Sequence, residues 1–365
     1  MRIRTNLMAG LVTAAALIAS APAHAEEAEL HVFNWYDNID PAVIERFETE
    51  TGIAVTYDNF DSSEMLETKL LAGKSGYDVV FPGVSNGQTL LRAGAIQPVD
   101  PAKLKSYGNL DKDILAQLDR HEAGRSVGVP YTWGTIGISY NADAVTERIG
   151  ALPENVLDLI FDPALTAKLK DCGIGLLDSP SEVIPVALIY LGLDPASGNA
   201  ADLDKVKALF EPVRGDYRYF NSGRLTNDLA NGEICVALSY NGDAGIAYMR
   251  AQEAGLDLDL RYQIPSIGTM MFIDLMAIPA DAPHPENAYR FIEFMLDPEV
   301  IATTSNLVYF ANANRESLPH VSDDVKGDPN IYPPQAVKDR LVAFSVLEPK
   351  VTRVRTRAWT DIKTD

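Results

Sequence analysis

The chain has 365 residues and a formal net charge of −20, with 31 Lys and Arg against 51 Asp and Glu. Such an acidic surface repels nucleic acid and anionic lipid and attracts cations, which argues against a nucleic-acid-binding protein; solubility alone is the alternative explanation of the charge. The length exceeds one typical core, so we expect two domains.

The first 25 residues have the pattern of a secretory signal peptide. Arg2 and Arg4 precede an apolar run over 7–18, and Ala23-His24-Ala25 is a small-x-small cleavage pattern. A membrane anchor is the alternative, but the run is shorter than the roughly 20 apolar residues that span a bilayer. We expect cleavage after Ala25 and export to the periplasm without a lipid anchor. Losing the two arginines takes the charge from −20 to −22 and leaves 340 of the 365 residues.

Cys172 and Cys235 are the two cysteines of the chain. Both lie in the part expected to be exported, where thiols are usually oxidised, so an even pair favours one disulfide. Two separately buried thiols are the alternative, because the sequence gives no distance between them.

Short apolar runs alternate with amphipathic stretches from residue 30 onward, which is typical of an α/β fold with open, mostly parallel sheets. Asp40 is the predicted N-cap of a helix that has proline in its first turn and ends at Gly52. Asp61 and Glu64 predict a capping box for a second helix, which Gly73 ends. The strands predicted around these helices cover 30–35, 53–60 and 77–81.

Residues 131–141 predict a β segment that passes from one lobe to another. Further strands are predicted at 174–178, 234–238 and 270–278, and a helix at 285–296. We assign residues 26–135 and about 250–302 to lobe 1, and residues 136–249 and about 303–365 to lobe 2. Several crossings between lobes favour a hinged cleft over two domains joined by one linker.

Four carboxylates lie at or near predicted strand ends, where ligands bind in open α/β sheets. They are Asp37, Glu182, Asp243 and Asp274. Asp274 stands between Phe272-Ile273 and Leu275-Met276, where burial of an acid is costly unless a cation or a donor meets it. A bridging arginine is the structural alternative to a bound cation.

Aromatic residues accompany these acids. Trp35 and Tyr36 precede Asp37, Tyr240 precedes Asp243, and Phe272 precedes Asp274. Aromatic faces attract ammonium groups and shelter methylenes, while carboxylates pair with the charged ends. Core packing explains any one aromatic residue, but the recurrence in three distant segments predicts a site for an aliphatic dication.

Other chemistries have weaker support. The five histidines and two cysteines show no metal-ligand spacing, so we expect no metal and no cofactor. Ser85 and Ser239 lie near strand ends but outside any G-x-S-x-G motif, which disfavours a serine hydrolase. A glycosidase-like pair formed by Asp243 and Asp274 stays open as the enzyme alternative.

Along essentially its whole mature length, the chain resembles the periplasmic putrescine-binding proteins of bacterial polyamine ABC importers. The matching segments, in chain order, are Asn34-Trp35 with Asp37, 50–53, 60–62, 131–138, 227–232, 311–314, 331–334 and 353–359. Their order and separations identify the family more strongly than the ligand.

The resemblance implies a two-lobed type II periplasmic-binding fold that closes on a polyamine by a hinge motion and delivers it to an inner-membrane ABC permease. It also implies the Cys172–Cys235 disulfide. We expect a monomer that is not an enzyme and binds no nucleic acid. The ligand-site positions that carry over are Trp35, Asp37, Glu182, Asp243, Phe272 and Asp274. Asp243 and Asp274 would hold ammonium groups, and Asp37 and Glu182 would add field or water-mediated contacts.

Five positions depart from those relatives. Tyr36 and Gly83 each stand where a serine is expected, Asn38 and Phe310 each replace a tyrosine, and Tyr240 replaces a tryptophan. The acids persist while the lining changes, so cadaverine, agmatine and spermidine stay open as ligands. A ligand-loaded partner of a sensor stays open as a role.

Overall fold

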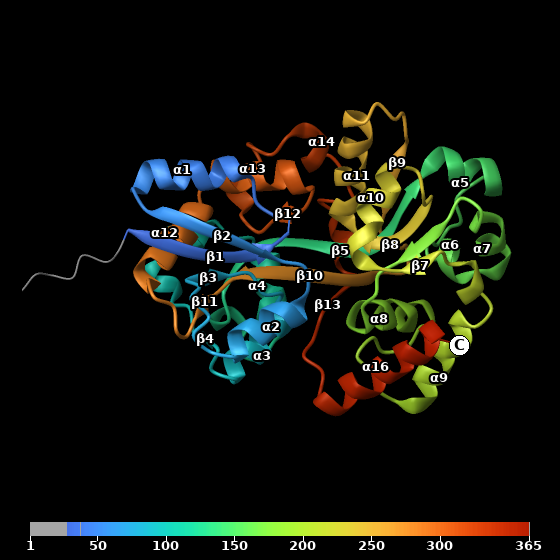
Figure 1. Cartoon of the computed structure of the whole chain (residues 1–365), viewed down its shortest axis with the longest axis horizontal. Coiled ribbons are helices and arrows are strands. Elements are labelled where there is room, and N and C mark those ends of the chain that lie inside the picture. The colour runs from blue at the N-terminus through green and yellow to red at the C-terminus, as the bar shows by residue number, and fades with distance from the viewer. Residues whose placement is uncertain (1–27, 37, 365) are drawn as a thin grey trace, which may run out of the picture.

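The computed structural model describes residues 28–36 and 38–364, so the expected signal peptide and Asp37 lie outside the described residues. Two groups of elements lie side by side along the long axis of the molecule (Figure 1). Within 28–36 and 38–364, no helix combines the length and the apolar character that crossing a membrane requires.

The first lobe begins with a small parallel sheet. Strand β1 (Glu29–Trp35) lies between β2 (Ala54–Phe60) and β3 (Val79–Val80). Asp40 caps α1 (Pro41–Thr51) by accepting a hydrogen bond from the Ala42 N–H at 2.8 Å, and Gly52 ends the helix with φ 72°. These predictions are confirmed. Helix α2 (Ser63–Leu71) is capped by Ser62 instead of Asp61, because the Ser62 hydroxyl is the group that accepts from the Met65 N–H.

The remaining elements follow in chain order. The strands are β4 (Ile96–Gln97), β5 (Val129–Asn141), β6 (Ile174–Leu176), β7 (Tyr219–Phe220), β8 (Val236–Tyr240), β9 (Leu260–Gln263), β10 (Thr269–Met276), β11 (Ile278–Pro279), β12 (Ala311–Asn312) and β13 (Leu341–Ala343). The helices are α3 (Val84–Arg92), α4 (Lys112–Leu118), α5 (Ala142–Ile149), α6 (Asp158–Phe161), α7 (Pro163–Leu169), α8 (Pro180–Tyr190), α9 (Ala200–Phe210), α10 (Leu225–Ala230), α11 (Asn241–Glu253), α12 (Pro285–Met295), α13 (Pro298–Val308), α14 (Asp323–Lys326), α15 (Gln335–Lys338) and α16 (Pro349–Thr364).

A larger sheet runs through both lobes in the order β13-β10-β5-β8-β6-β7. Its central strand β5 is buried over all 13 residues and pairs antiparallel with β10, β12, β8 and β9. This sheet is therefore mixed, which corrects the expected mostly parallel arrangement. The passage predicted at 131–141 is confirmed, because Trp133 belongs to the first hydrophobic core and Ile136 to the second.

The two cores divide the chain differently from the predicted lobes. Leu260 of β9 packs in the second core, whereas Tyr262 of the same strand packs in the first. Residues between Ala311 and Leu341 pack in the first core, because β12 pairs with the first-lobe half of β5. Within residues 303–365, the buried residues of the second core are Ala358, Trp359 and Ile362, and all three belong to helix α16.

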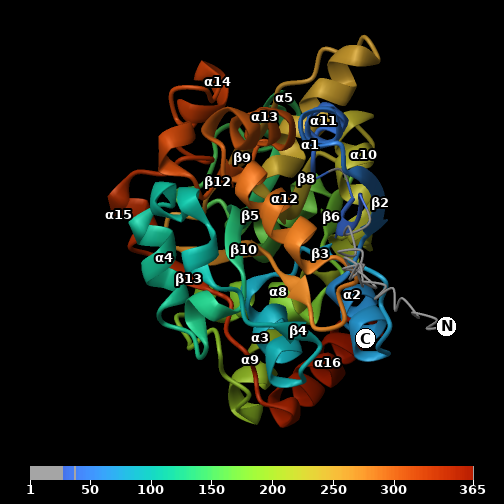
Figure 2. The ribbon, with the colours of Figure 1, turned by 90° about the vertical axis from the view of Figure 1, so that its left-hand side faces the viewer.

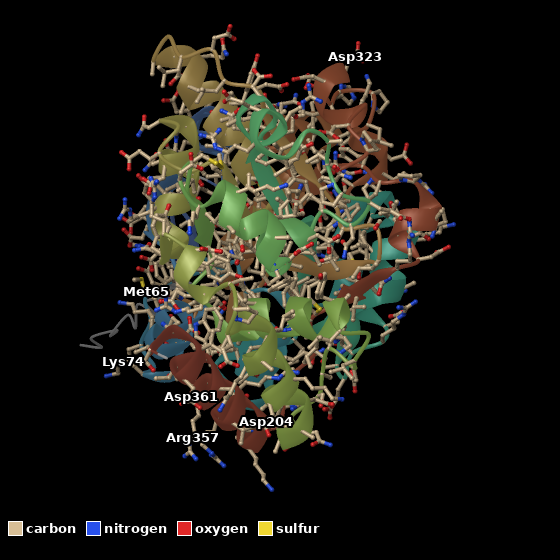
Figure 3. The ribbon with its side chains drawn as sticks, turned by 90° about the vertical axis from the view of Figure 1, so that its right-hand side faces the viewer. Met65, Lys74, Asp204, Asp323, Arg357 and Asp361 are labelled. Carbon is tan, nitrogen blue, oxygen red and sulfur yellow. A yellow bond between two sulfur atoms is a disulfide. The ribbon has the colours of Figure 1, made fainter. Side chains whose placement is uncertain are left out.

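Helix α16 ends the described chain against the second lobe. Its Asp361 pairs with Lys207 of α9 at 2.5 Å. Figure 2 shows α9 and α16 close together below the sheet, and Figure 3 shows Asp204 and Arg357 projecting outward from these two helices. The C-terminal helix therefore returns to the second lobe after the chain has left the first.

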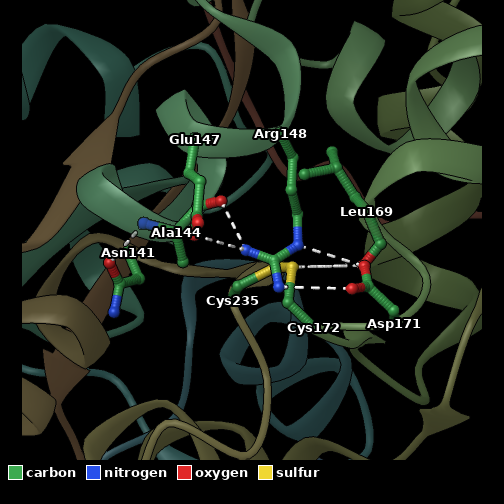
Figure 4. A network of polar contacts seen from close by, with 8 residues as sticks. All are labelled: Asn141, Ala144, Glu147, Arg148, Leu169, Asp171, Cys172 and Cys235. Carbon is green, nitrogen blue, oxygen red and sulfur yellow. Dashed lines mark hydrogen bonds and ion pairs between the residues drawn. A yellow bond between two sulfur atoms is a disulfide. The ribbon is translucent and has the colours of Figure 1, made fainter.

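The disulfide between Cys172 and Cys235 is confirmed, with Cα atoms 5.5 Å apart. It joins the segments that lead into β6 and β8, which are parallel neighbours. Beside it, Arg148 of α5 donates to Asp171 at 3.0 Å and to the Ala144 carbonyl at 2.9 Å (Figure 4). The disulfide and this ion pair hold α5 and the segments that precede β6 and β8 together at one end of the second lobe.

Replacing Cys172 and Cys235 together by serine is expected to lower the free energy of unfolding by about 2 to 4 kcal/mol, because the unfolded chain regains the freedom of a long closed loop. Urea denaturation of the oxidised protein and the double variant measures this. A matched comparison is the wild type under reducing conditions, which should lose a similar amount. Equal midpoints for all three samples would contradict a stabilising role.

Candidate functional site

Asp274 lies where strand β10 is irregular. The pairing of β10 with β5 shifts register between Ile273 and Leu275, so Asp274 leaves the β5 ladder and forms a bridge with Gly83. A Cβ atom at Gly83 would lie 3.7 Å from the Asp274 carboxylate. The bulge thus turns an acid out of an otherwise apolar strand.

Asp274 is 7% exposed, and its carboxyl has a strongly raised pKa. Burial, and then the charge of Glu182, raises the pKa of Asp274 to about 8, against a lowering by the Trp35 indole. Trp35 Nε1 is buried and makes no hydrogen bond of ordinary geometry within the described residues, so it faces the carboxylate without a tight contact. No lysine or arginine contributes to the shift, so the bridging arginine considered from the sequence is absent from the described part of the chain.

Asp243 lies in the first turn of α11 and has a structural task as well. Its carboxylate accepts hydrogen bonds from the Tyr240 N–H at 3.0 Å and from the Thr226 hydroxyl at 3.1 Å. Burial raises the pKa of Asp243 to about 6, against the lowering effect of these donors. Asp243 therefore caps its own helix, a contact that the sequence interpretation missed.

Glu182 lies in the first turn of α8 and meets Tyr240 across the second lobe. The Tyr240 hydroxyl donates to the Glu182 carboxylate. Burial raises the pKa of Glu182, and the charges of Glu64 and Asp243 raise it further. The tyrosine in the place of the expected tryptophan thus supplies a donor to an acid that lacks a cation.

Three aromatic rings form a row beside these acids. Tyr240 and Phe272 lie 5.5 Å apart at 87°, and Phe272 and Phe310 lie 5.2 Å apart at 80°, both edge to face. The rings come from β8, from β10 and from the segment after α13, so they join the two lobes. In such pairs the edge of one ring packs against the face of the next.

Gly134 makes room for this row. It pairs with Phe272, and a Cβ atom at Gly134 would lie 2.6 Å from the Phe272 ring and 2.1 Å from Asn241 Oδ1. The same Asn241 oxygen accepts a hydrogen bond from the Thr135 N–H at 3.0 Å. The glycine therefore lets the start of α11 and the Phe272 ring approach β5 together.

Replacing Gly134 by alanine is expected to destabilise the protein by about 1 to 3 kcal/mol, because the added methyl overpacks this junction. Thermal unfolding measures the loss. Gly108 offers a matched control, since a Cβ there meets nothing within 4 Å. Equal melting temperatures for the Gly134→Ala and Gly108→Ala variants would show that the junction can accommodate the added methyl group.

The family described as bacterial extracellular solute-binding protein matches residues 42–333. The chain belongs to this family. It is 44% identical over 359 residues to the putrescine-binding periplasmic protein PotF of Escherichia coli, covering 98% of this chain and 97% of that protein. It is also 44% identical over 353 residues to the putrescine-binding periplasmic protein SpuD of Pseudomonas aeruginosa, covering 96% of each.

Solved structures support the two-lobed fold of this solute-binding protein. A putative spermidine/putrescine ABC transporter protein from Listeria monocytogenes superimposes with a TM-score of 0.80 at 27% identity, covering 92% of this chain and 99% of that one. A substrate-binding protein from Streptococcus pneumoniae superimposes with a TM-score of 0.78. The type II periplasmic-binding fold expected from the sequence is confirmed.

The structure brings together most of the residues predicted for the ligand site of this solute-binding protein. Contacts or charge interactions link Trp35, Gly83, Glu182, Tyr240, Asp243, Phe272, Asp274 and Phe310. Asp37 lies outside the described residues, so its predicted role stays a prediction.

Tyr36 and Asn38 are the other two predicted positions that the structure describes. Tyr36 is 68% exposed, and the Asn38 carbonyl accepts from the Tyr131 hydroxyl at 2.7 Å. Sequence reasoning missed Thr226 and Asn241. Asn241 follows a strand end directly, which could have marked it, whereas Thr226 carries no such signal. Among the described residues, no cluster of His, Cys, Asp and Glu has the arrangement of a metal site.

Proposed function

We propose that this protein captures a small linear polyamine of the putrescine type in the periplasm and delivers it to an inner-membrane ABC permease. Residues 1–25 would direct export and be removed after Ala25. The protein would act as a monomer, without a cofactor and without turnover of its ligand.

The observation that carries the proposal is the buried, uncompensated Asp274 carboxyl. A buried acid without a cation is costly, and it shifts its pKa until a positive group arrives. The charge of Glu182 acts on Asp274, the charge of Asp243 acts on Glu182, and both acids have raised pKa values of their own. An ammonium group at each end of a short aliphatic chain would relieve this cost, and the aromatic row would cover the methylenes.

The relatives support the same class of ligand. Besides the two putrescine-binding proteins, a putrescine/agmatine-binding protein of Pseudomonas aeruginosa is 38% identical over 98% of this chain. A putrescine/cadaverine-binding protein of that species is 29% identical. Because Tyr240, Gly83 and Phe310 change the lining, we keep agmatine, cadaverine and spermidine as alternative ligands.

Capture would proceed in three steps. The acidic surface would raise the local concentration of cationic amines. The amine would then pair with Asp274 and Asp243 while the lobes are apart. Closure would exclude water and bring Tyr240 and Phe272 over the chain of the ligand. The closed, loaded form would be the one that the permease recognises.

Calorimetric titration of the ligand-stripped mature protein tests the proposal. We would titrate putrescine, cadaverine, agmatine, spermidine and 4-aminobutanoate at two salt concentrations. Tight binding of a cationic amine, weaker at high salt, is the expected result. 4-Aminobutanoate, with one end negative, is the control. Recovery of the amine unchanged would support binding without turnover. No heat with any amine would overturn the proposal.

A further inference from the structure

A cavity of about 200 Å³ lies outside the acidic site, against the strands that join the lobes. Its walls are α4 and α15, and Figure 2 shows both on one flank of the molecule, near β13. The space is comparable to cavities that hold one small organic molecule.

The floor of this cavity is formed by three strands of the sheet that runs through both lobes. Trp133 is on β5, Met271 on β10 and Leu341 on β13, and all three line the cavity. Each belongs to the first core, whereas Ile136 and Met270, a few residues away on β5 and β10, belong to the second. A molecule on this floor would therefore contact β5 and β10 within a few residues of the points where they enter the second core.

The charged groups of the walls are mostly paired. Lys338 lies 3.9 Å from Asp113, and its ammonium stands 5.6 Å from the centre of the Trp133 ring. Asp339 accepts from the Gln335 amide at 2.9 Å. The carboxylates of Asp113 and Asp339 thus both have partners, and the Trp133 ring is already in contact with an ammonium group.

Two groups of the walls lack a partner among the described residues. Gln117 Oε1 is buried and accepts no hydrogen bond. Arg120 is exposed at the rim of the cavity and forms no ion pair with a carboxylate among the described residues, and its charge lowers the pKa of the neighbouring His121 after the larger effect of burial. The cavity therefore offers an apolar floor, one buried acceptor without a donor and one solvent-exposed cation at its rim.

We propose that this cavity is a second ligand site, for a small amino carboxylate, linked to the arrangement of the lobes. The carboxylate would pair with Arg120, an N–H group would donate to Gln117, and the aliphatic stem would lie on Trp133, Met271 and Leu341. Because β5 and β10 run from this floor into the second core, the shape of the site would change with the arrangement of the lobes, and its ligand would favour the present one. The acidic site is assembled in the same arrangement, so the second ligand strengthens amine binding.

The test uses the mature protein labelled with ¹⁵N, and 6-aminohexanoate as the probe. The indole N–H signals of the three tryptophans report separately, and Trp133→Phe assigns one of them. We expect a saturable shift of the Trp133 signal with 6-aminohexanoate, and much weaker shifts with hexanoate or hexylamine, which each lack one of the charged groups. At saturation, putrescine should bind about fivefold tighter.

Arg120→Gln should remove the response of Trp133 to the probe. Arg357→Gln is the matched control. Arg357 is exposed on α16 (Figure 3), and its replacement removes the same charge far from the cavity. No saturable shift, or a shift that survives Arg120→Gln, would overturn the second site. A saturable shift with unchanged putrescine affinity would overturn the linkage. If putrescine fails to bind while the probe response persists, the proposed function fails and the second site stands.

Discussion

Replacing Asp274 by asparagine is expected to remove most amine binding while leaving the unliganded protein at least as stable as the wild type. The amide keeps the size of the side chain but gives up the charge that would pair with an ammonium group. Loss of one partner of a desolvated pair costs about 2 to 5 kcal/mol, which corresponds to roughly a thirtyfold to several-thousandfold weaker affinity. Stability should not fall, because burial opposes the charged form of Asp274.

Calorimetry with putrescine and thermal unfolding without ligand measure the two effects. Asp204→Asn is the matched control. Asp204 is exposed on α9 (Figure 3), and its replacement removes the same charge away from the site. Asp243→Asn is a poorer probe than the sequence suggested, because Asp243 also accepts from Tyr240 and Thr226 at the start of α11. Unchanged affinity in Asp274→Asn would refute the assignment of the ammonium site.

The sequence predicted those parts of the fold that local chemistry determines. Asp40 and Gly52 mark the ends of α1 because a cap and a left-handed glycine act within a few residues. The crossing strand β5 was recognisable as a long apolar β segment. Near Leu260 and Ala311 the two hydrophobic cores do not follow the predicted lobes, because both segments pair with β5, a contact between residues far apart in sequence.

For the site, strand ends and acid–aromatic pairs located Glu182, Asp243 and Asp274. The pattern could not predict which groups contact each of these acids. The bulge that turns Asp274 toward Gly83 depends on the register of β10 against β5. The Tyr240 hydroxyl reaches Glu182 only because β8 and α8 pack together. Partners of this kind depend on tertiary contacts, which no local motif encodes.

Binding of the amine is expected to strengthen as the pH rises toward 8 and to release a proton. The pKa of Asp274 is raised to about 8 by burial and by Glu182 of α8, against the Trp35 indole of β1. An alkylammonium group stays charged to about pH 10, so the ligand does not titrate in this window. Since the ammonium pairs with the ionised carboxylate, binding below pH 8 displaces the proton of Asp274, and affinity should rise by about tenfold per unit.

The same shift makes the unliganded protein less stable at higher pH. Between the ordinary pKa of 3.8 and about 8, the folded state keeps a proton that the unfolded chain releases. The free energy of unfolding therefore falls as the pH rises through this window, by an amount on the order of 5 kcal/mol for this group. Asp243, with its pKa raised to about 6, acts in the same direction over a narrower window.

Titration calorimetry in buffers of different ionisation enthalpy measures the released proton, and urea denaturation at several pH values measures the stability. Asp274→Asn should flatten both profiles between pH 6 and 8 and leave the smaller contribution of Asp243. A proton release that persists in this variant would assign the titration to another group, and Glu182, with its pKa also raised by burial, would be the next acid to replace. Loss of the proton release would identify Asp274 as the carboxyl that the amine meets, because the proton leaves from the group that becomes paired.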